Sequence, residues 1–402
     1  MQVCISKNLL GTDKNLLCER STGLFSWVSS PPEDAWIYGN APNAVRSLND
    51  LCLMFNIDPR DRPPEKYVTA YTTCGLPAGL SIPWHHALPR AVFQSYISNL
   101  VADLWSALDK INDTTYVDNF LVNREALTSL QPALIDKKIL NDLKAQETNP
   151  TLISTLNSFS PKPDDKLPPP VYQQGATGRT VVKRGPKILT LKKEHRKIFK
   201  SRYPGGRIIQ VDYSSLEPRI AGCLAGVEFD KDIYDSLALK TGLKLDRVKL
   251  KIAVMGALYG ISPVKLQLIV GRDVDASIVL DKIRTFFKID VLARRLLREC
   301  HESGSSIQNY YGRPLTFTKC DSHLLVSHYI QSTGVDVCLS GFRKIIEEIR
   351  AKDLGITPIY IIHDALLLDV APFAVDDLKN LVKTASVISG FKESFPLSIS
   401  KV

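Results

Sequence analysis

The sequence predicts an α+β protein, in which a few apolar strands form a sheet and helices supply most of the rest. Two observations indicate the strands. Residues 208–211 are apolar except for Gln210 and run into a polar turn at Asp212, and residues 359–368 are apolar except for His363-Asp364 at their centre. The third observation is the helical spacing of apolar residues over 214–224, over most of 232–301 and over 324–350.

The bulk composition describes a folded chain with more than one domain. At 402 residues, we expect two or three lobes. The hydrophobic content of 44% and the charged content of 23% are typical of a soluble globular protein rather than a disordered one. The net charge of +9 favours a polyanionic partner, although ribosomal, membrane-surface and simply alkaline proteins share such a balance.

Cysteine usage and hydropathy suggest the compartment. The eight cysteines include no Cys-x-x-Cys pair, which argues against a zinc ribbon or a disulfide framework and favours reduced, mostly buried thiols. No stretch of eighteen uninterrupted apolar residues occurs, so we expect no membrane span and a soluble, intracellular protein of the cytoplasm.

The first half of the chain divides into three segments. Residues 1–95 are rich in turn formers, and the sequence assigns them no role. Residues 90–143 show a helical apolar face, which predicts a helical arm. The proline-rich stretch 158–170 predicts a semi-rigid connector and a domain boundary near 160–170.

A basic run follows over 183–202. Most charge runs are solvated surface, but beside a catalytic strand this run favours contacts with a phosphate backbone.

Two aspartates are the strongest chemical signal. Asp212 and Asp364 each end an apolar strand, where a carboxylate is costly unless it binds a cation or receives hydrogen bonds. Either aspartate alone is explained as a cap. As a pair on one sheet, they predict a site for two Mg²⁺ ions roughly 3.5–4 Å apart, which serve a 3′-hydroxyl nucleophile and a triphosphate.

A helical stripe between the aspartates supplies cations. Its residues recur every four positions and are Arg247, Lys251, Met255 and Tyr259. An amphipathic surface helix would also explain the spacing. The glycines within 255–260 weaken a helix, which indicates close approach of a flat group such as a base pair, while the two cations face phosphates. Carboxylates and cations together predict phosphoryl transfer from a nucleoside triphosphate.

Five segments resemble a known family. Asp212-Tyr213-Ser214-x-x-Glu217-x-Arg219 resembles motif A of the family A, or DNA polymerase I-like, DNA polymerases. Arg247-x3-Lys251-x3-Met255-Gly256-x2-Tyr259-Gly260 resembles their motif B, and His363-Asp364 resembles motif C. Thr177-Gly178-Arg179 and Gln331-x4-Asp336 extend the resemblance, which covers roughly 171–402.

The resemblance implies a right-hand polymerase architecture with an antiparallel-sheet palm, helical fingers and a helical thumb. The implied domains are an N-terminal region of unknown role (1–95), a thumb-like helical region (96–170), a first palm part (171–225), fingers (226–322) and a second palm part (323–402).

The resemblance also implies residue roles. Metal would be held by Asp212, Asp364 and the main-chain carbonyl of Tyr213, with Mn²⁺ as a substitute for Mg²⁺. The nucleotide-binding residues would be Arg247, Lys251, Met255, Tyr259 and Glu217, where Glu217 acts as a steric gate against a 2′-hydroxyl. The DNA-binding residues would be Arg179 at the primer end, Gln331 at the template-primer duplex, His363 at the primer terminus, and Arg219.

Five positions depart from the family pattern, among them His323 and Ser327, which stand where Arg and Asn are often found upstream of Gln331. Met255 stands where Phe or Tyr is usual, and Ala365 stands where Glu is usual; both resemble single-subunit RNA polymerases. Tyr234 replaces a phosphate-contacting His, which bears on triphosphate affinity. Glu217 favours the DNA polymerase interpretation.

The implied function is template-directed DNA synthesis on primer-template DNA with dNTPs, with replication accessory proteins as further partners. Residues 1–160 contain no Asp-x-Glu strand, so we expect no proofreading. A stand-alone form suggests a phage or other mobile replicon. Two alternatives stay open: an RNA polymerase or primase, and a catalytically silent nucleic-acid-binding subunit.

Overall fold

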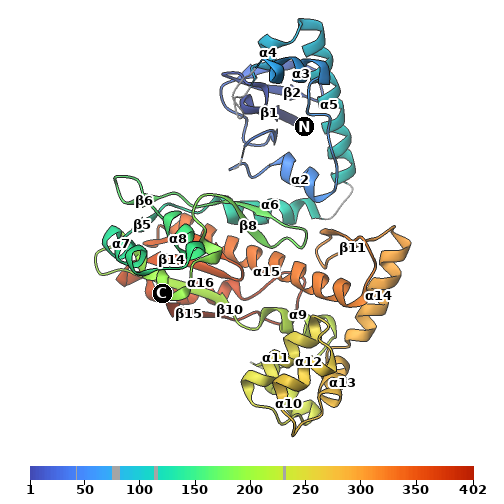
Figure 1. Ribbon diagram of the computed structural model, residues 1–402, viewed down its shortest axis with the longest axis vertical. Coiled ribbons are helices and arrows are strands. Elements are labelled where there is room, and N and C mark those ends of the chain that lie inside the picture. Colours follow the sequence, from blue (N-terminus) through green and yellow to red (C-terminus); the bar gives the residue numbers. More distant parts are fainter. Residues whose placement is uncertain (42, 75–81, 113–115, 230–231) are drawn as a thin grey trace. The chain divides into compact units, whose positions relative to one another are not determined.

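The structure is a computed structural model that describes residues 1–41, 43–74, 82–112, 116–229 and 232–402. It divides into two compact units, Met1–Thr128 and Ser129–Val402 (Figure 1). No helix among these residues is both long and apolar enough to cross a membrane.

The first unit combines a four-stranded sheet with helices. The strand order is β3-β2-β1-β4, with β1 antiparallel to β2 and parallel to β4. The elements are β1 (Gln2–Ile5), α1 (Lys7–Leu10), β2 (Asn15–Glu19), β3 (Phe25–Val28), β4 (Trp36–Tyr38), α2 (Leu48–Met54), α3 (Glu65–Thr73), α4 (Trp84–Ala87), α5 (Arg90–Asn112) and α6 (Tyr116–Thr128).

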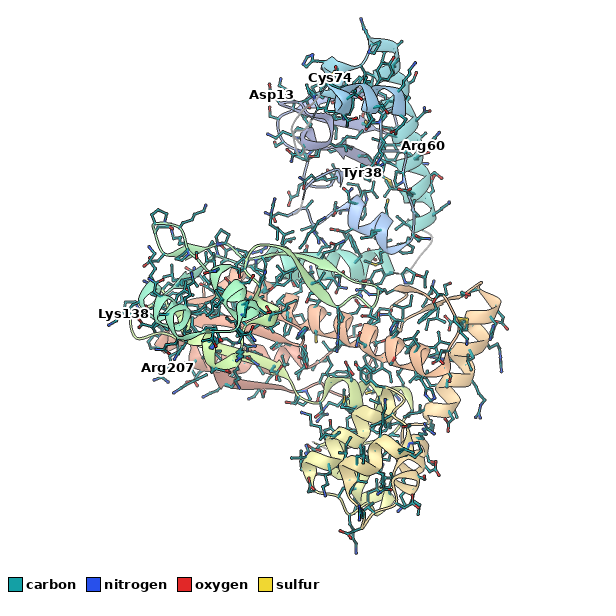
Figure 2. The ribbon with its side chains drawn as sticks, viewed as in Figure 1. Asp13, Tyr38, Arg60, Cys74, Lys138 and Arg207 are labelled. Carbon is teal, nitrogen blue, oxygen red and sulfur yellow. A yellow bond between two sulfur atoms is a disulfide. The ribbon has the colours of Figure 1, made fainter. Side chains whose placement is uncertain are left out.

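Helix α5 belongs to this first unit. Its Asp103 pairs with Arg60 (Figure 2) at 2.7 Å, and its Asp109 pairs with Arg20 at 2.6 Å. The expected boundary between 95 and 96 therefore cuts through a packed unit, and the region 96–170 is divided between the two units. The pattern of α5 predicts a helix correctly, but periodicity does not tell which neighbours a helix packs against.

The second unit is built on an antiparallel sheet of order β13-β14-β10-β15. Its strands are β10 (Arg207–Tyr213), β13 (Ile356–Ile362), β14 (Ala365–Val370) and β15 (Leu397–Lys401). Both β13 and β14 are buried along their whole length, which explains why they read as continuous apolar runs rather than as alternating ones. The predicted α+β class and the predicted strands at 208–211 and 359–368 are confirmed, whereas β15 was not predicted.

Helices pack around this sheet. The 31-residue α15 is the longest, and it packs against α9, α14, α16 and β13 (Figure 1). The helices are α7 (Lys137–Gln146), α8 (Pro150–Asn157), α9 (Leu216–Leu224), α10 (Ile233–Thr241), α11 (Arg247–Leu258), α12 (Pro263–Val270), α13 (Ala276–Phe286), α14 (Ile289–Glu302), α15 (Ser322–Lys352) and α16 (Val375–Ala385).

Short strands complete the second unit and correct the predicted connector. They are β5 (Ala133–Ile135), β6 (Lys166–Leu167), β7 (Val171–Gln174), β8 (Thr180–Arg184), β9 (Phe199–Lys200), β11 (Ser306–Gln308) and β12 (Pro314–Thr316). Strand β6 pairs with β5, and Asp165 pairs with both Lys137 and Lys200 at 2.7 Å. The proline-rich stretch thus lies inside a unit and is not a domain boundary, because its backbone completes a sheet.

The expectation of reduced thiols throughout is also wrong. Cys300 at the end of α14 and Cys320 just before α15 form a disulfide, with their Cα atoms 6.2 Å apart. The two residues are 20 apart in sequence, and the β11–β12 hairpin between them brings the chain back on itself. This closure depends on tertiary geometry, which cysteine spacing does not encode.

Candidate active site

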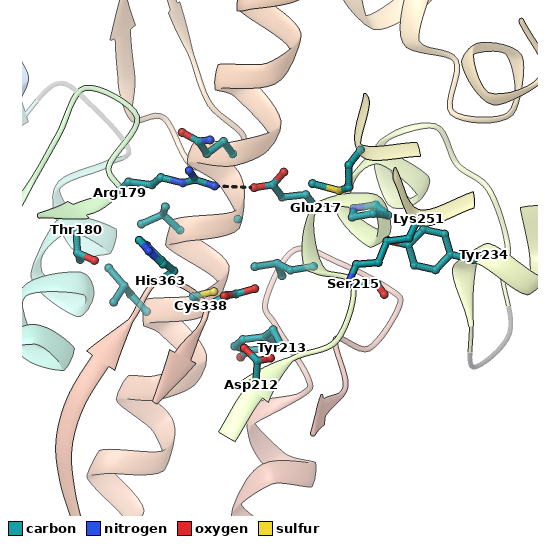
Figure 3. Close-up of a pocket in the computed structure, with 18 residues that line it drawn as sticks. Arg179, Thr180, Asp212, Tyr213, Ser215, Glu217, Tyr234, Lys251, Cys338 and His363 are labelled. Atoms are coloured by element: carbon teal, nitrogen blue, oxygen red, sulfur yellow. Dashed lines mark hydrogen bonds and ion pairs between the residues drawn. The ribbon is translucent and has the colours of Figure 1, made fainter. Parts of the chain in front are cut away.

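The two aspartates come together at one end of the second unit's sheet. Asp212 on β10 is registered opposite Ala365 on β14, and Asp364 is the next residue in the turn. The main-chain N–H of Tyr213 donates to the carbonyl of Asp364 at 3.1 Å. Both aspartates line one cavity of about 290 Å³, shown in Figure 3. Adjacent antiparallel strands therefore bring together two acidic residues that are far apart in the sequence.

The electrostatics of this pair fit a cation site. Burial and the negative charge of Asp364 raise the pKa of Asp212 to about 6, against the opposing effects of Lys251, Lys193 and Arg196. A buried carboxylate that is repelled by its neighbour gains most from a divalent cation. Carboxylate and carbonyl oxygens are also the donors that Mg²⁺ prefers. The donor set of Asp212, Asp364 and the Tyr213 carbonyl therefore fits the metal that the resemblance implies.

A residue near each aspartate has a left-handed backbone conformation with positive φ. Ser215, which precedes α9, has φ 55°, and His363, which precedes Asp364, has φ 54°. Left-handed backbone is unfavourable for residues with a side chain, and such strain gathers at functional sites. Burial and the nearby Arg179 cation lower the pKa of His363, so its imidazole is neutral near pH 7.

Glu217 is the centre of a hydrogen-bond network across the cavity. The Tyr259 hydroxyl donates to Glu217 Oε2 at 2.7 Å, and Arg179 lies 3.4 Å from Glu217 Oε1 (Figure 3). The side-chain amide of Gln331 connects the hydroxyls of Tyr259 and Thr177, at 3.0 and 2.8 Å. Four segments distant in sequence thus hold one another, and burial raises the pKa of Glu217.

The helical stripe of α11 is only partly in the cavity. Lys251 and Met255 line the cavity of the two aspartates, and Tyr259 joins them in lining a neighbouring open pocket. Arg247 lines neither of these pockets. Its guanidinium pairs with Asp232 and with Asp235 and lies 4.5 Å from the centre of the Tyr234 ring.

The two glycines of the stripe have packing reasons. A Cβ at Gly256 would lie 2.9 Å from the side chain of Ile261. Gly260 has φ 76°, and a Cβ there would lie 2.7 Å from His323. In this structure, the close approach that the sequence indicated is thus made by the chain's own side chains, although Gly256 also borders the open pocket.

Arg219 does not take the predicted place at DNA. Its side chain is buried, and its guanidinium donates to the carbonyls of Ser214 at 3.2 Å and Ser394 at 3.4 Å. It also lies over the Phe229 ring at 5.4 Å. Because this guanidinium binds internal carbonyls, Arg219 secures the start of α9 instead of meeting a phosphate.

Sequence reasoning missed several residues that line the cavity. Ser215, Gly334, Val335 and Cys338 all contribute to its wall, as does Tyr234, which the sequence had marked as a departure from the family pattern. The residues of α15 follow Gln331 at helical spacing, so a projection of that face from Gln331 would have found them. No comparable signal identifies Asp232 and Asp235 as partners of Arg247, because this pairing depends on how α10 and α11 pack.

Gly341 of α15 makes room for Tyr213 beneath the two aspartates. The Tyr213 hydroxyl would lie 1.7 Å from a Cβ at this glycine, and it donates to the carbonyl of Ala385 at 3.2 Å. Gly341→Ala is therefore expected to lower the unfolding free energy by about 1–3 kcal/mol or more, measured by urea denaturation.

Gly334 on the same helix provides the matched control. A Cβ there would meet Ile220 at 3.4 Å, which is ordinary contact, so Gly334→Ala is expected to keep full stability. Removal of the hydroxyl by Tyr213→Phe in the Gly341→Ala background should restore part of the loss. Equal losses from both alanine variants would contradict this packing argument.

Comparisons with known proteins identify the family and the fold. The family model described as DNA polymerase family A matches residues 99–400. Among solved structures, the POL domain of Pol1 from M. smegmatis in complex with DNA primer-template and dNTP is similar, with a TM-score of 0.65 and 13% identity over 96% of this chain and 92% of that chain. No curated protein sequence matches significantly. The structural likeness confirms the right-hand polymerase fold that the resemblance implied.

Proposed function

The chain belongs to DNA polymerase family A and is a DNA-directed DNA polymerase, and from this we propose that it extends a primer 3′-hydroxyl with dNTPs by two-metal-ion phosphoryl transfer. The observation that carries this proposal is the meeting of Asp212 and Asp364 in one cavity that Lys251 also lines. That combination provides anionic ligands for Mg²⁺ and a cation for a triphosphate within a single cavity.

Different residues of the cavity would bind the metal and the triphosphate. Asp212, Asp364 and the Tyr213 carbonyl would hold the metal, and two Mg²⁺ ions there supply activation of the 3′-hydroxyl and neutralisation of the phosphates. Lys251 presents a point charge to the triphosphate, and Met255 lies beside it along the same helix face.

On the opposite wall, the side chains would contact the primer end. Arg179, Gln331 and His363 all line the cavity, and the first two are held by the network around Glu217. The similar POL domain was solved with DNA primer-template and dNTP, which supports the same partners here. Replication accessory proteins remain a further prediction.

A primer-extension assay with labelled nucleotides tests the proposal. Wild-type protein with Mg²⁺ is expected to extend a recessed 3′ end with dNTPs in template order. Met255 and Ala365 favour the alternative of an RNA polymerase, so the same assay uses rNTPs in parallel. Preferential use of rNTPs would replace the proposal by that alternative, and DNA binding without any extension would indicate a silent subunit.

Lys251 is expected to govern nucleotide affinity. Lys251→Ala should raise the KM for dNTP by about tenfold or more, because a charge-assisted contact to phosphate contributes about 1.5–3 kcal/mol. Steady-state kinetics at saturating primer-template measure the change. Lys249→Ala is the matched control on the same helix, since its ammonium donates to the Val270 carbonyl at 3.1 Å. Equal KM changes in both variants would refute the assignment.

We further propose that the protein does not proofread. An Asp-x-Glu strand, which would supply exonuclease carboxylates, is absent from residues 1–160. A labelled primer with a mismatched 3′ end is expected to stay intact when incubated with Mg²⁺ and no dNTP. Stepwise shortening of that primer, retained in Asp212→Asn protein, would show a separate exonuclease site.

A further inference from the structure

A buried ion pair lies outside the cavity. Arg313, in the turn between β11 and β12, and Asp336, on α15, are both fully buried, and Arg313 Nη2 lies 2.5 Å from Asp336 Oδ1. Asn309 Nδ2 donates to Asp336 Oδ2 at 2.6 Å and to Ser332 Oγ at 3.0 Å. Apolar residues often replace a buried pair without loss of stability, so stability alone does not account for these charges.

The guanidinium of Arg313 supports a specific turn. Gly178 has φ 81°, and a Cβ there would lie 2.5 Å from Arg313 Cζ and 2.9 Å from its Nε. The backbone of Gly178 therefore packs against the flat Arg313 guanidinium, with no space for a side chain between them. Gly178 belongs to the turn between β7 and β8, which is closed by hydrogen bonds of 2.8 Å from Gly178 N to Gly175 O and from Gly175 N to Arg179 O.

The residues on either side of Gly178 reach the cavity network. The Thr177 hydroxyl lies 2.8 Å from the Gln331 amide, and Arg179 lies 3.4 Å from Glu217. Gln331 also lies on α15, five residues before Asp336. One buried guanidinium thus fixes the distance between the turn and the helix that together present polar groups to the proposed primer end.

We propose that the Arg313–Asp336 pair is a positioning device for Arg179, and through it for the primer end. This rests on the proposed function. Arg313 touches no substrate and acts through the Gly178 backbone. The planar Arg313 guanidinium donates to the Asp336 carboxylate through two nitrogens, Nε at 3.3 Å and Nη2 at 2.5 Å. Its flat face contacts the turn that contains Gly178. A lysine at this position would keep the charge but lose the second contact and the face.

A double-mutant cycle tests the proposal. Arg313→Lys and Arg179→Ala are each expected to lower kcat/KM for primer-template by about tenfold or more, since small misplacements of positioning groups cost up to 10²-fold. If Arg313 acts through Arg179, the double variant should be no worse than Arg179→Ala alone. Additive losses, or wild-type kinetics for Arg313→Lys, would overturn the proposal.

Two further variants separate positioning from general damage. Arg124→Lys removes the guanidinium of another buried arginine, which pairs with the partly exposed Asp50 at 3.0 Å in the first unit, and should leave kcat/KM unchanged. Should Arg313→Lys fail to fold, Gly178→Ala serves instead, because its Cβ would clash with the same guanidinium. Its loss of kcat/KM should be non-additive with that of Arg179→Ala in the same way. Additive losses for that pair would equally reject the proposal.

The cycle is repeated with equilibrium binding of a fluorescent duplex with a recessed 3′ end. Binding decides the positioning claim independently of extension: non-additive losses of affinity support it and additive losses reject it. Absence of extension by the wild-type chain would instead refute the proposed function.

Discussion

Replacement of Asp212 or Asp364 by asparagine is expected to reduce the single-turnover rate of primer extension by about 10³-fold, which corresponds to about 4 kcal/mol of barrier. Asparagine keeps the shape of the side chain but removes the charge that the metal requires. The two carboxylates line one cavity, and burial together with the charge of Asp364 raises the pKa of Asp212, so a cation between them is favourable. Rapid quenching of a preformed complex after addition of dNTP and Mg²⁺ measures the rate.

Stability measurements distinguish this loss from unfolding. Because the charged form of Asp212 is disfavoured by burial, Asp212→Asn is expected to melt no lower than the wild type in the absence of metal. Mg²⁺ should raise the Tm of the wild type and not of the variant. Asp376→Asn, which changes an exposed carboxylate of α16, is the control for charge alone. A variant at Asp212 or Asp364 with near wild-type rate would remove that residue from the catalytic assignment.

Glu217→Ala is expected to lower the discrimination between dNTPs and rNTPs by about 10²-fold, the scale on which a shaped site rejects an added or missing group. The side chain of Glu217 is held by Tyr259 at 2.7 Å and by Arg179 at 3.4 Å, so it cannot swing aside freely for a 2′-hydroxyl. Truncation opens that space. The ratio of kcat/KM for a matched dNTP and rNTP measures the effect.

The isosteric variant Glu217→Gln separates volume from charge. It fills the same space and can still bond to Tyr259, so it should retain most of the discrimination. If Glu217→Gln loses as much discrimination as Glu217→Ala, the gate works through charge and the steric argument is wrong. If neither variant changes the ratio, sugar selection belongs to another part of the cavity.

Local sequence patterns were sufficient to predict several strands and several residues of the cavity. Apolar runs identified β13 and β14, because strands buried on both faces leave a continuous signature. The apolar residues of 208–211 also identified β10, in which buried residues alternate with partly exposed ones. Spacing of four placed Lys251 and Met255 on one face of α11, and both line the cavity. Asp212 and Asp364 could be recognised because a carboxylate at the end of an apolar strand is costly to bury without a cation or hydrogen bonds.

Pairings between distant segments were not visible in these patterns. Arg219 was expected at DNA and Arg247 at the nucleotide, yet packing buries the first against main-chain carbonyls and pairs the second with Asp232. The Cys300–Cys320 disulfide and the Arg313–Asp336 pair likewise arise from how helices and hairpins meet. Periodicity reports which face of an element is apolar, whereas the partner of a charged or sulfur-bearing side chain depends on three-dimensional proximity, which the folded chain alone establishes.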